Sequence, residues 1–299
     1  MKIRIGTRGS KLALWQAGEV QRTLEAKGYS TAIKIISTKG DEIQDRPVQE
    51  IGGKGLFTRE LDEALLNNEV DVAVHSAKDI PNQLENGLEI CAALKREDPR
   101  DVLVSASEEV DPENQNVSFV IGTSSVRRAA LLRHYAGAWK IAQLRGNIDT
   151  RVKKMLNGEY DGIMVAYAGI KRLEIKGVKV FKLNPTTFTP APGQGIVAVM
   201  AKTGNEALLP LRESLNHVQS ETELRCERAY LTKMEAGCSV PVFALSTVVG
   251  ENITMMAGFA KEDGSAIFRE ELSGSISEPE WLGITIAETI IQKSGGIRG

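Results

Sequence analysis

The chain has 299 residues, of which 42% are hydrophobic and 25% are charged, a composition typical of a globular protein with two or three domains. Its formal net charge of −2 gives no overall attraction to nucleic acid or to a membrane surface, and no apolar run approaches the ~18 residues of a membrane span. Three widely spaced cysteines argue against a disulfide scaffold, and three histidines without paired-ligand spacing argue against a zinc site.

The first hundred residues alternate between strand-like and helix-like patterns. Ala13, Ala17, Val20 and Leu24 recur on one face of a helix that ends at Gly28. A β-α-β-α-β order predicts a mostly parallel sheet with helices on both faces and ligands at the carboxyl ends of its strands. The expected elements are a strand at 2–6, a helix at 10–28, a strand at 31–38, a helix at 55–68 and a strand at 70–76.

The pattern restarts after residue 100. The segments IGTRGS (5–10) and IGTSSVRR (121–128) both place Gly-Thr, a small hydroxyl residue and arginine between a strand and a helix. Two similar lobes that aim helix starts and arginines at a shared cleft would produce this echo, and so would a common N-capping turn. The sequence does not choose between them. Strands are expected at 101–105, 118–122, 140–144 and 162–166, with helices beginning near Ser124, Asp149 and Ala168.

The last third changes character. The breaker cluster PAPGQG (190–195) predicts a hinge, and a strand is expected at 195–201. Ser220 and Glu223 form a capping-box pattern at the start of a helix over 220–234. A separate α+β domain should follow, with strands at 242–249, 252–260 and 266–274 and a closing helix from about Glu278.

Basic residues are concentrated between Arg127 and Lys154. This segment contains eight of them and one acidic residue, Asp149, so its local net charge is +7. Several lie in the first turns of expected helices, where cations oppose the helix dipole. An anion is the expected compensation, because arginine forks and helix N-terminal amides both bind carboxylates or phosphates. A polyanionic small ligand is favoured over a solvated basic face. Nucleic acid is disfavoured, because aromatic residues make up only 5% of the chain.

Two other segments carry candidate chemistry. In VDVAVHSAKDIP (70–81), Lys78 and Asp79 follow a buried strand, which is suited to proton handling or to stabilising a cation; a salt-bridged loop remains the alternative. In IGGKGLF (51–57), glycines free backbone amides around Lys54, as in an anion-cradling loop, but the segment lacks a P-loop ending and a hinge fits equally well.

Cys238 lies in the bend EAGCSVPVF, at the entrance of the last domain. A small buried hydrophobic residue is the usual fate of a free cysteine, and no local acid or base pattern points to thiol catalysis. Cys91 and Cys226 are expected in a strand and a helix of the core.

Taken in order, several runs resemble one family. The runs GTRGSKLALWQA, GGKGLFTREL, VHSAKDIP, REDPRD, GTSSVRR, LRGNIDTR, PAPGQG and the Gly-Cys segment match the porphobilinogen deaminase (hydroxymethylbilane synthase) family along nearly the whole chain. The resemblance implies a transferase of tetrapyrrole and haem biosynthesis. It would condense four porphobilinogen molecules, with loss of ammonia, onto a dipyrromethane cofactor bound to Cys238 through a thioether, and release hydroxymethylbilane.

The same resemblance assigns roles residue by residue. Asp79 would stabilise the positive charge of the reacting pyrroles. The carboxylates of the cofactor would be held by Lys78, Ser125, Arg127 and Arg128. The incoming or growing pyrroles would be bound by Arg8, Ser10, Lys54, Arg145, Arg151 and Arg172.

The implied fold is α/β. Two lobes resembling periplasmic binding proteins, with mixed, mostly parallel sheets, would precede a small α+β domain with a three-stranded antiparallel sheet. We expect domain 1 at 1–96 and 195–215, domain 2 at 101–190 and domain 3 at 219–299.

The polar N-terminus without an apolar leader predicts a cytoplasmic protein, and a monomer without nucleic-acid, membrane or metal partners is expected. The competing hypothesis is a non-catalytic two-lobe protein that captures an organic anion. Such a protein needs neither Cys238 nor Asp79.

Overall fold

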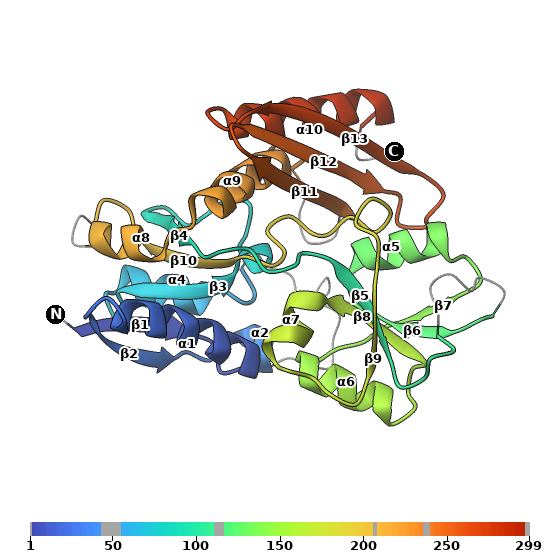
Figure 1. Cartoon of the computed structure of the whole chain (residues 1–299), viewed down its shortest axis with the longest axis horizontal. Coiled ribbons are helices and arrows are strands. Elements are labelled where there is room, and N and C mark those ends of the chain that lie inside the picture. Colours follow the sequence, from blue (N-terminus) through green and yellow to red (C-terminus); the bar gives the residue numbers. More distant parts are fainter. Residues whose placement is uncertain (1, 43–54, 111–116, 206–207, 236–239, 297–299) are drawn as a thin grey trace.

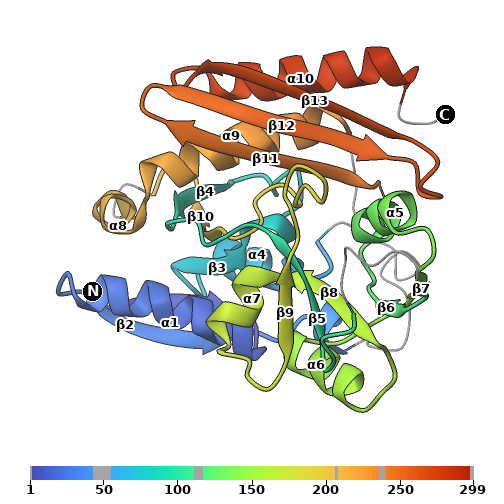
Figure 2. The same ribbon diagram turned by 45° about the vertical axis from the view of Figure 1, so that its right-hand side comes forward.

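Three β-sheets organise the protein (Figure 1). The computed structural model describes residues 2–42, 55–110, 117–205, 208–235 and 240–296. Two five-stranded sheets form two lobes, and a three-stranded sheet lies beside both (Figure 2). No helix in these ranges has both the length and the apolar character needed to cross a bilayer.

The first sheet has the strand order β2-β1-β3-β10-β4. Its strands are β1 (Lys2–Thr7), β2 (Ser30–Ile35), β3 (Val72–Ser76), β4 (Leu88–Ala93) and β10 (Val197–Lys202). Apolar residues on successive strand positions point to opposite faces, and both faces are covered. Helix α1 (Lys11–Glu25) packs on one face with α8 (Leu209–Leu215), and α4 (Arg59–Leu66) packs on the other. A short helix, α2 (Lys39–Glu42), follows β2.

The second sheet repeats this plan with the order β7-β6-β8-β5-β9. Helix α5 (Val126–Tyr135) covers one face, and α6 (Ile148–Leu156) with α7 (Tyr167–Arg172) covers the other. The strands are β5 (Asp101–Ser105), β6 (Val120–Gly122), β7 (Lys140–Ala142), β8 (Gly162–Ala166) and β9 (Lys179–Lys182).

The two lobes share one topology. In each sheet the fourth strand in the order is antiparallel to both neighbours, so that the other four run in a common direction. The odd strands are β5 and β10, and each follows a segment that passes from one lobe to the other. The sheets are therefore mixed and mostly parallel, as expected. The similar segments IGTRGS and IGTSSVRR lie at equivalent places in the two lobes, in the connections β1–α1 and β6–α5. Ser10 and Ser125 also form the N-caps of the helices that follow.

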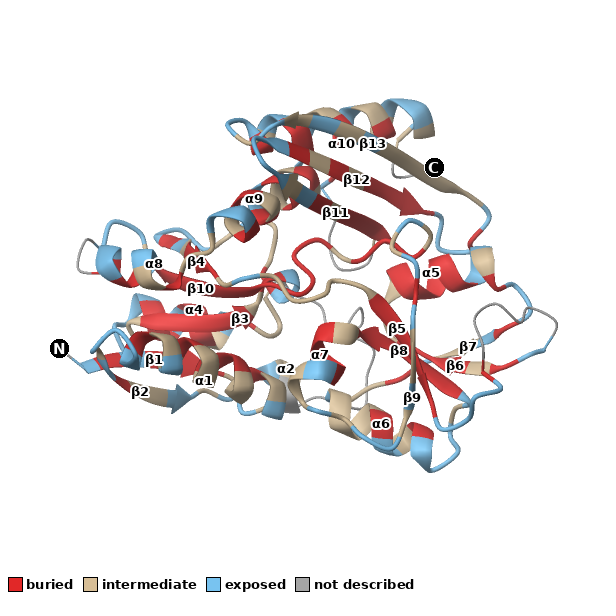
Figure 3. Ribbon diagram, in the orientation of Figure 1, coloured by how far each residue is buried: buried red, intermediate tan, exposed pale blue. Residues whose placement is uncertain are grey.

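The third sheet is an antiparallel meander of β11 (Val242–Val249), β12 (Asn252–Ala260) and β13 (Ile267–Ser275). Helices α9 (Val218–Lys233) and α10 (Pro279–Ser294) pack together against it around a core that includes Cys226. Cys91 lies in β4. Cys91 and Cys226 are both buried, as expected, and burial raises the pKa of each thiol to about 12. Figure 3 shows that buried positions are concentrated in central strands such as β3, β10, β5 and β8 and in β11 and β12, whereas β13 is intermediate or exposed.

One predicted helix start is wrong. The helix expected at Ser220 begins two residues earlier, and its N-cap is His217, whose Nδ1 accepts a hydrogen bond from Ser220 N at 3.3 Å. Ser220 Oγ instead accepts a hydrogen bond from Arg96 N at 2.9 Å. The serine therefore joins α9 to the segment that crosses between the lobes, a contact too distant in sequence for a local pattern to reveal.

Candidate functional site

The expected site residues that the structure describes lie just beyond the carboxyl ends of parallel strands in both lobes. Arg8 and Ser10 follow β1, and Lys78 and Asp79 follow β3 within the 3₁₀ turn Ala77–Asp79. In the second lobe they follow three neighbouring strands: Ser125, Arg127 and Arg128 after β6, Arg145 and Arg151 after β7, and Arg172 after β8. Lys54 and Cys238 lie outside the described residues.

Arg127 and Arg128 are buried at the start of α5, where they share one carboxylate. Arg127 Nη1 pairs with Asp101 Oδ2 at 2.7 Å, and Arg128 Nη2 pairs with Asp101 Oδ1 at 2.8 Å. Asp101 is completely buried at the start of β5, and the two guanidinium groups outweigh its burial and hold its pKa below the ordinary value. The trio retains a net charge of +1.

This pairing corrects the interpretation of the basic cluster. The cations at this helix start are partly neutralised by a carboxylate of the chain itself, rather than awaiting a ligand for all of their charge. Asp101 ends the run REDPRD, so its residue type was visible in the sequence. Its partners lie more than 25 positions away, and nothing local identified it as part of the site.

Gln194 connects the cations of the two lobes. Its Oε1 accepts hydrogen bonds from Lys78 Nζ and from Arg128 Nη2, both at 3.2 Å. Its Nε2 donates to Asp101 Oδ1 at 2.9 Å and to the carbonyl of Pro99 at 2.7 Å. The predicted hinge PAPGQG therefore supplies a buried amide to the centre of the site, a role that the sequence did not reveal.

Lys78 and Asp79 lie on the solvent side of this cluster. Lys78 is exposed to the solvent, yet protein atoms crowd around its ammonium group. This crowding lowers the pKa of Lys78 to about 8; nearby Arg128 lowers it further, whereas Asp79 opposes the shift. Asp79 is exposed, and its charge also supports the protonated form of Arg151.

Arg151 completes the group on the second lobe. Its Nε donates to the carbonyl of Gly146 at 2.7 Å. Burial and the charges of Arg128 and Arg145 lower the pKa of Arg151 to about 10. Such repulsion among cations makes a binding site for an anion, because a negative ligand relieves it.

Arg8 and Arg172 each lie over an aromatic ring, and Arg172 also contacts the hinge, where its Nη2 donates to the carbonyl of Gly195 at 2.7 Å. The guanidinium carbon of Arg8 lies 4.4 Å from the centroid of Phe57, and that of Arg172 lies 5.2 Å from the centroid of Trp15. Arg172 belongs to the second lobe and Trp15 to the first, so that this contact crosses between lobes. Ser10 and Ser125 accept hydrogen bonds from the amides of Ala13 and Arg128.

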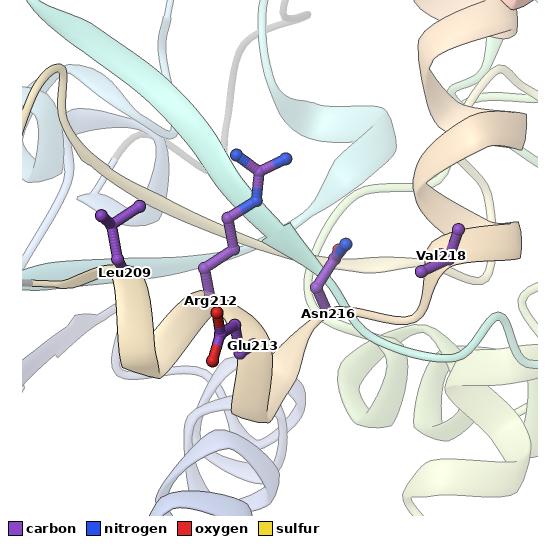
Figure 4. A pocket seen from close by; sticks show the side chains of 5 residues that line it. All are labelled: Leu209, Arg212, Glu213, Asn216 and Val218. Atoms are coloured by element: carbon purple, nitrogen blue, oxygen red, sulfur yellow. The ribbon is translucent and has the colours of Figure 1, made fainter. Parts of the chain in front are cut away.

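A surface pocket of about 360 Å³ lies elsewhere. Figure 4 shows its lining by Leu209, Arg212 and Glu213 of α8 with Asn216 and Val218 at the start of α9. It contains none of the expected site residues.

Two family models match this chain, one over the two lobes and one over the C-terminal domain. Residues 3–210 match the family model described as "Porphobilinogen deaminase, dipyromethane cofactor binding domain", and residues 222–292 match "Porphobilinogen deaminase, C-terminal domain". The chain is 40% identical over 297 residues to a porphobilinogen deaminase of Desulfosudis oleivorans, covering 99% of this chain and 96% of that one. It is 42% identical over 295 residues to a porphobilinogen deaminase of Cytophaga hutchinsonii, covering 98% and 94%.

Solved structures with a similar outline include the substrate-binding protein of an amino acid ABC transporter, at 18% identity and a TM-score of 0.40 over 72% of this chain and 91% of that one. Another is the periplasmic VFT2 domain of Bordetella pertussis BvgS, at 12% identity and a TM-score of 0.43 over 71% and 86%. Likeness at this level carries no conclusion about function.

Proposed function

The chain belongs to the porphobilinogen deaminase family, and from that premise we propose that it joins four porphobilinogen molecules head to tail and releases hydroxymethylbilane. Each addition expels one ammonia. The observation that carries the proposal is the cationic cluster of Lys78, Arg128 and Arg151 at facing strand ends of two lobes, with Asp79 beside it. Porphobilinogen bears an acetate and a propionate arm, so a chain of pyrroles is a polyanion that such a cluster suits.

The residues present fit a dipyrromethane cofactor. The buried Nε–H groups of Arg127 and Arg172 have no hydrogen-bond acceptor among the described residues, and an added carboxylate would supply one. Lys78, Ser125, Arg127 and Arg128 would hold the carboxylates, and Cys238 would carry the covalent bond. The bound group would supply the pyrrole carbon from which the chain grows. Its attachment would make each coupling effectively intramolecular.

We assign substrate binding to the remaining polar groups around the cluster. Arg145 and Arg151 would bind pyrrole carboxylates from the second lobe, together with Arg172, and Arg8, Ser10 and Lys54 would do so from the first. Asp79 would stabilise the positive charge that arises when porphobilinogen loses ammonia and couples, because its carboxylate is the exposed negative group of this cluster.

The wider predictions stand as proposals. The division into 1–96 with 195–215, 101–190 and 219–299 is supported by the strand content of the three sheets. We also propose a cytoplasmic monomer whose partners are porphobilinogen and its product. The small number of cysteines supports a reducing compartment.

The direct test is incubation of the purified chain with porphobilinogen. We expect a linear tetrapyrrole and one ammonia for each porphobilinogen consumed, measured by absorbance after chemical oxidation and by an ammonia assay. Binding of porphobilinogen without ammonia release would instead support the anion-capturing protein.

The lowered pKa of Lys78 predicts a specific pH dependence for cofactor assembly. The charged ammonium, present below about pH 8, is the form that binds carboxylate, so that binding should weaken as the pH rises through that value. Lys78→Arg keeps its charge throughout this range. The assembly rate of the wild-type protein relative to Lys78→Arg, measured by mass spectrometry, should fall about tenfold between pH 7 and pH 9. A constant ratio would remove Lys78 from this role.

A further inference from the structure

Arg228 connects the helix that leads to the cysteine segment with the turn that carries Asp79. It lies in the last two turns of α9, ten positions before Cys238. Its Nη2 donates to two successive carbonyls, that of Pro81 at 2.8 Å and that of Asn82 at 3.0 Å. Pro81 lies two positions after Asp79 along the chain, so this guanidinium holds the chain just beyond the carboxylate.

The other side of the same turn is held by the hinge. Ala77 N donates to the carbonyl of Ile196 at 3.0 Å. Gly193 approaches so closely that an added Cβ would lie 3.0 Å from Ala77 Cβ. The Asp79 turn is thus fixed before Lys78 by the hinge and after Ile80 by Arg228.

Packing holds the residue just before that second attachment, because Ile80 is buried in the core with Leu61 and Leu65. A cavity of about 300 Å³ lies between α9 and the edge strand β4, lined by Arg228 with Leu84, Ile90 and Ala92. Pro81 and Asn82 themselves are only partly buried, so that the hydrogen bonds from Arg228 add to the packing of Ile80 in fixing their carbonyls.

Arg228 also differs from its neighbour Arg225 in its charge partners. Arg225 forms an exposed ion pair with Glu280 through two hydrogen bonds of 2.6 and 3.0 Å. Among the described residues no carboxylate pairs with Arg228, and burial lowers its pKa to about 10. A half-buried cation bonded only to carbonyls is a costly way to stabilise a fold, which favours a role in the site.

We propose that Arg228 is a positioning residue that fixes the carboxylate of Asp79 relative to helix α9 of domain 3. The proposal rests on the proposed function. It deepens that function by assigning the placement of the Asp79 carboxylate to one side chain of domain 3. A misplacement of about 1 Å can cost up to about 10²-fold in rate, so losing this clamp should slow coupling without preventing primer attachment.

The test compares Arg228→Met, Arg228→Lys and the control Arg225→Met. Rates are expressed per molecule that carries the pyrrole adduct, counted by intact mass, so that unfolded or unprimed protein does not contribute. We expect Arg228→Met to retain the adduct, to lose about 10- to 100-fold in kcat and to keep KM within about threefold. Arg228→Lys, which can still donate to a carbonyl, should recover most of the loss, and Arg225→Met should match the wild type.

Two results would overturn the proposal. One is a wild-type kcat for the adduct-bearing Arg228→Met protein, and the other is an equal loss in Arg225→Met. The proposed function fails separately, because in that case the wild-type protein itself would carry no adduct and make no product.

Discussion

Replacing Asp79 with asparagine is expected to reduce kcat about 10²–10³-fold, because the variant loses a preorganised negative charge where positive charge develops. The amide has nearly the same size and can still accept a hydrogen bond, so the change isolates the charge. Lys78, Arg128 and Arg151 lie around the same site, and without the carboxylate they would leave a reacting cation among cations. The measurement is steady-state turnover of protein that carries the full adduct.

Asp71→Asn is the matched control. Asp71 lies just before the other end of β3 and pairs with Arg4 at 2.7 Å on the exposed side of the lobe. Exposed pairs contribute little, so this variant should keep its kcat. An Asp79→Asn protein with turnover close to that of the control would remove Asp79 from its assigned role.

Replacing Asp101 with alanine is expected to destabilise the protein by about 3–5 kcal/mol, because two buried guanidinium groups lose their shared counter-charge. Both arginine side chains and Asp101 are less than a tenth exposed, so that solvent cannot screen the loss. The folded-state pKa of Asp101 is lowered, so its contribution is present above about pH 4 and is lost only as the pH falls further. Denaturant unfolding at pH 7 measures the effect.

Asp98→Ala provides the comparison within the same sequence run. Asp98 pairs with Arg100 at 2.7 Å and with Lys182 at 3.4 Å, and both cations are more than a third exposed. Its loss should cost no more than about 1 kcal/mol. Equal destabilisation by the two alanine variants would mean that the buried trio contributes no more than a surface pair.

Much of the fold was predictable because local patterns determine it. Alternation and helical periodicity placed β1, α1, β3 and the meander of the last domain close to their observed bounds. Strand neighbours were not predictable in this way. The insertion of β10 between β3 and β4 joins residues more than 100 positions apart, and periodicity indicates that a segment is a strand without indicating its partner.

The residues of the candidate site were likewise predictable where local patterns mark them and unpredictable where they depend on long-range contacts. Strand-end position and charge pointed to Lys78, Asp79 and the arginines between Arg127 and Arg151, because the ends of parallel strands meet at one edge of a sheet. Arg172 was expected only from the family resemblance. The pairing of Asp101 with Arg127 and Arg128, and the bridge through Gln194, depend on how the two crossing segments pack. No local pattern encodes such contacts.

The proposed covalent attachment at Cys238 is tested most directly by the intact mass of the purified chain after incubation with porphobilinogen. The thioether-bound primer predicts an increase of about two pyrrole units that resists denaturation and is absent in Cys238→Ala, together with loss of product formation in that variant. A chain that makes the linear tetrapyrrole at full rate while its mass stays that of the bare polypeptide would contradict the account.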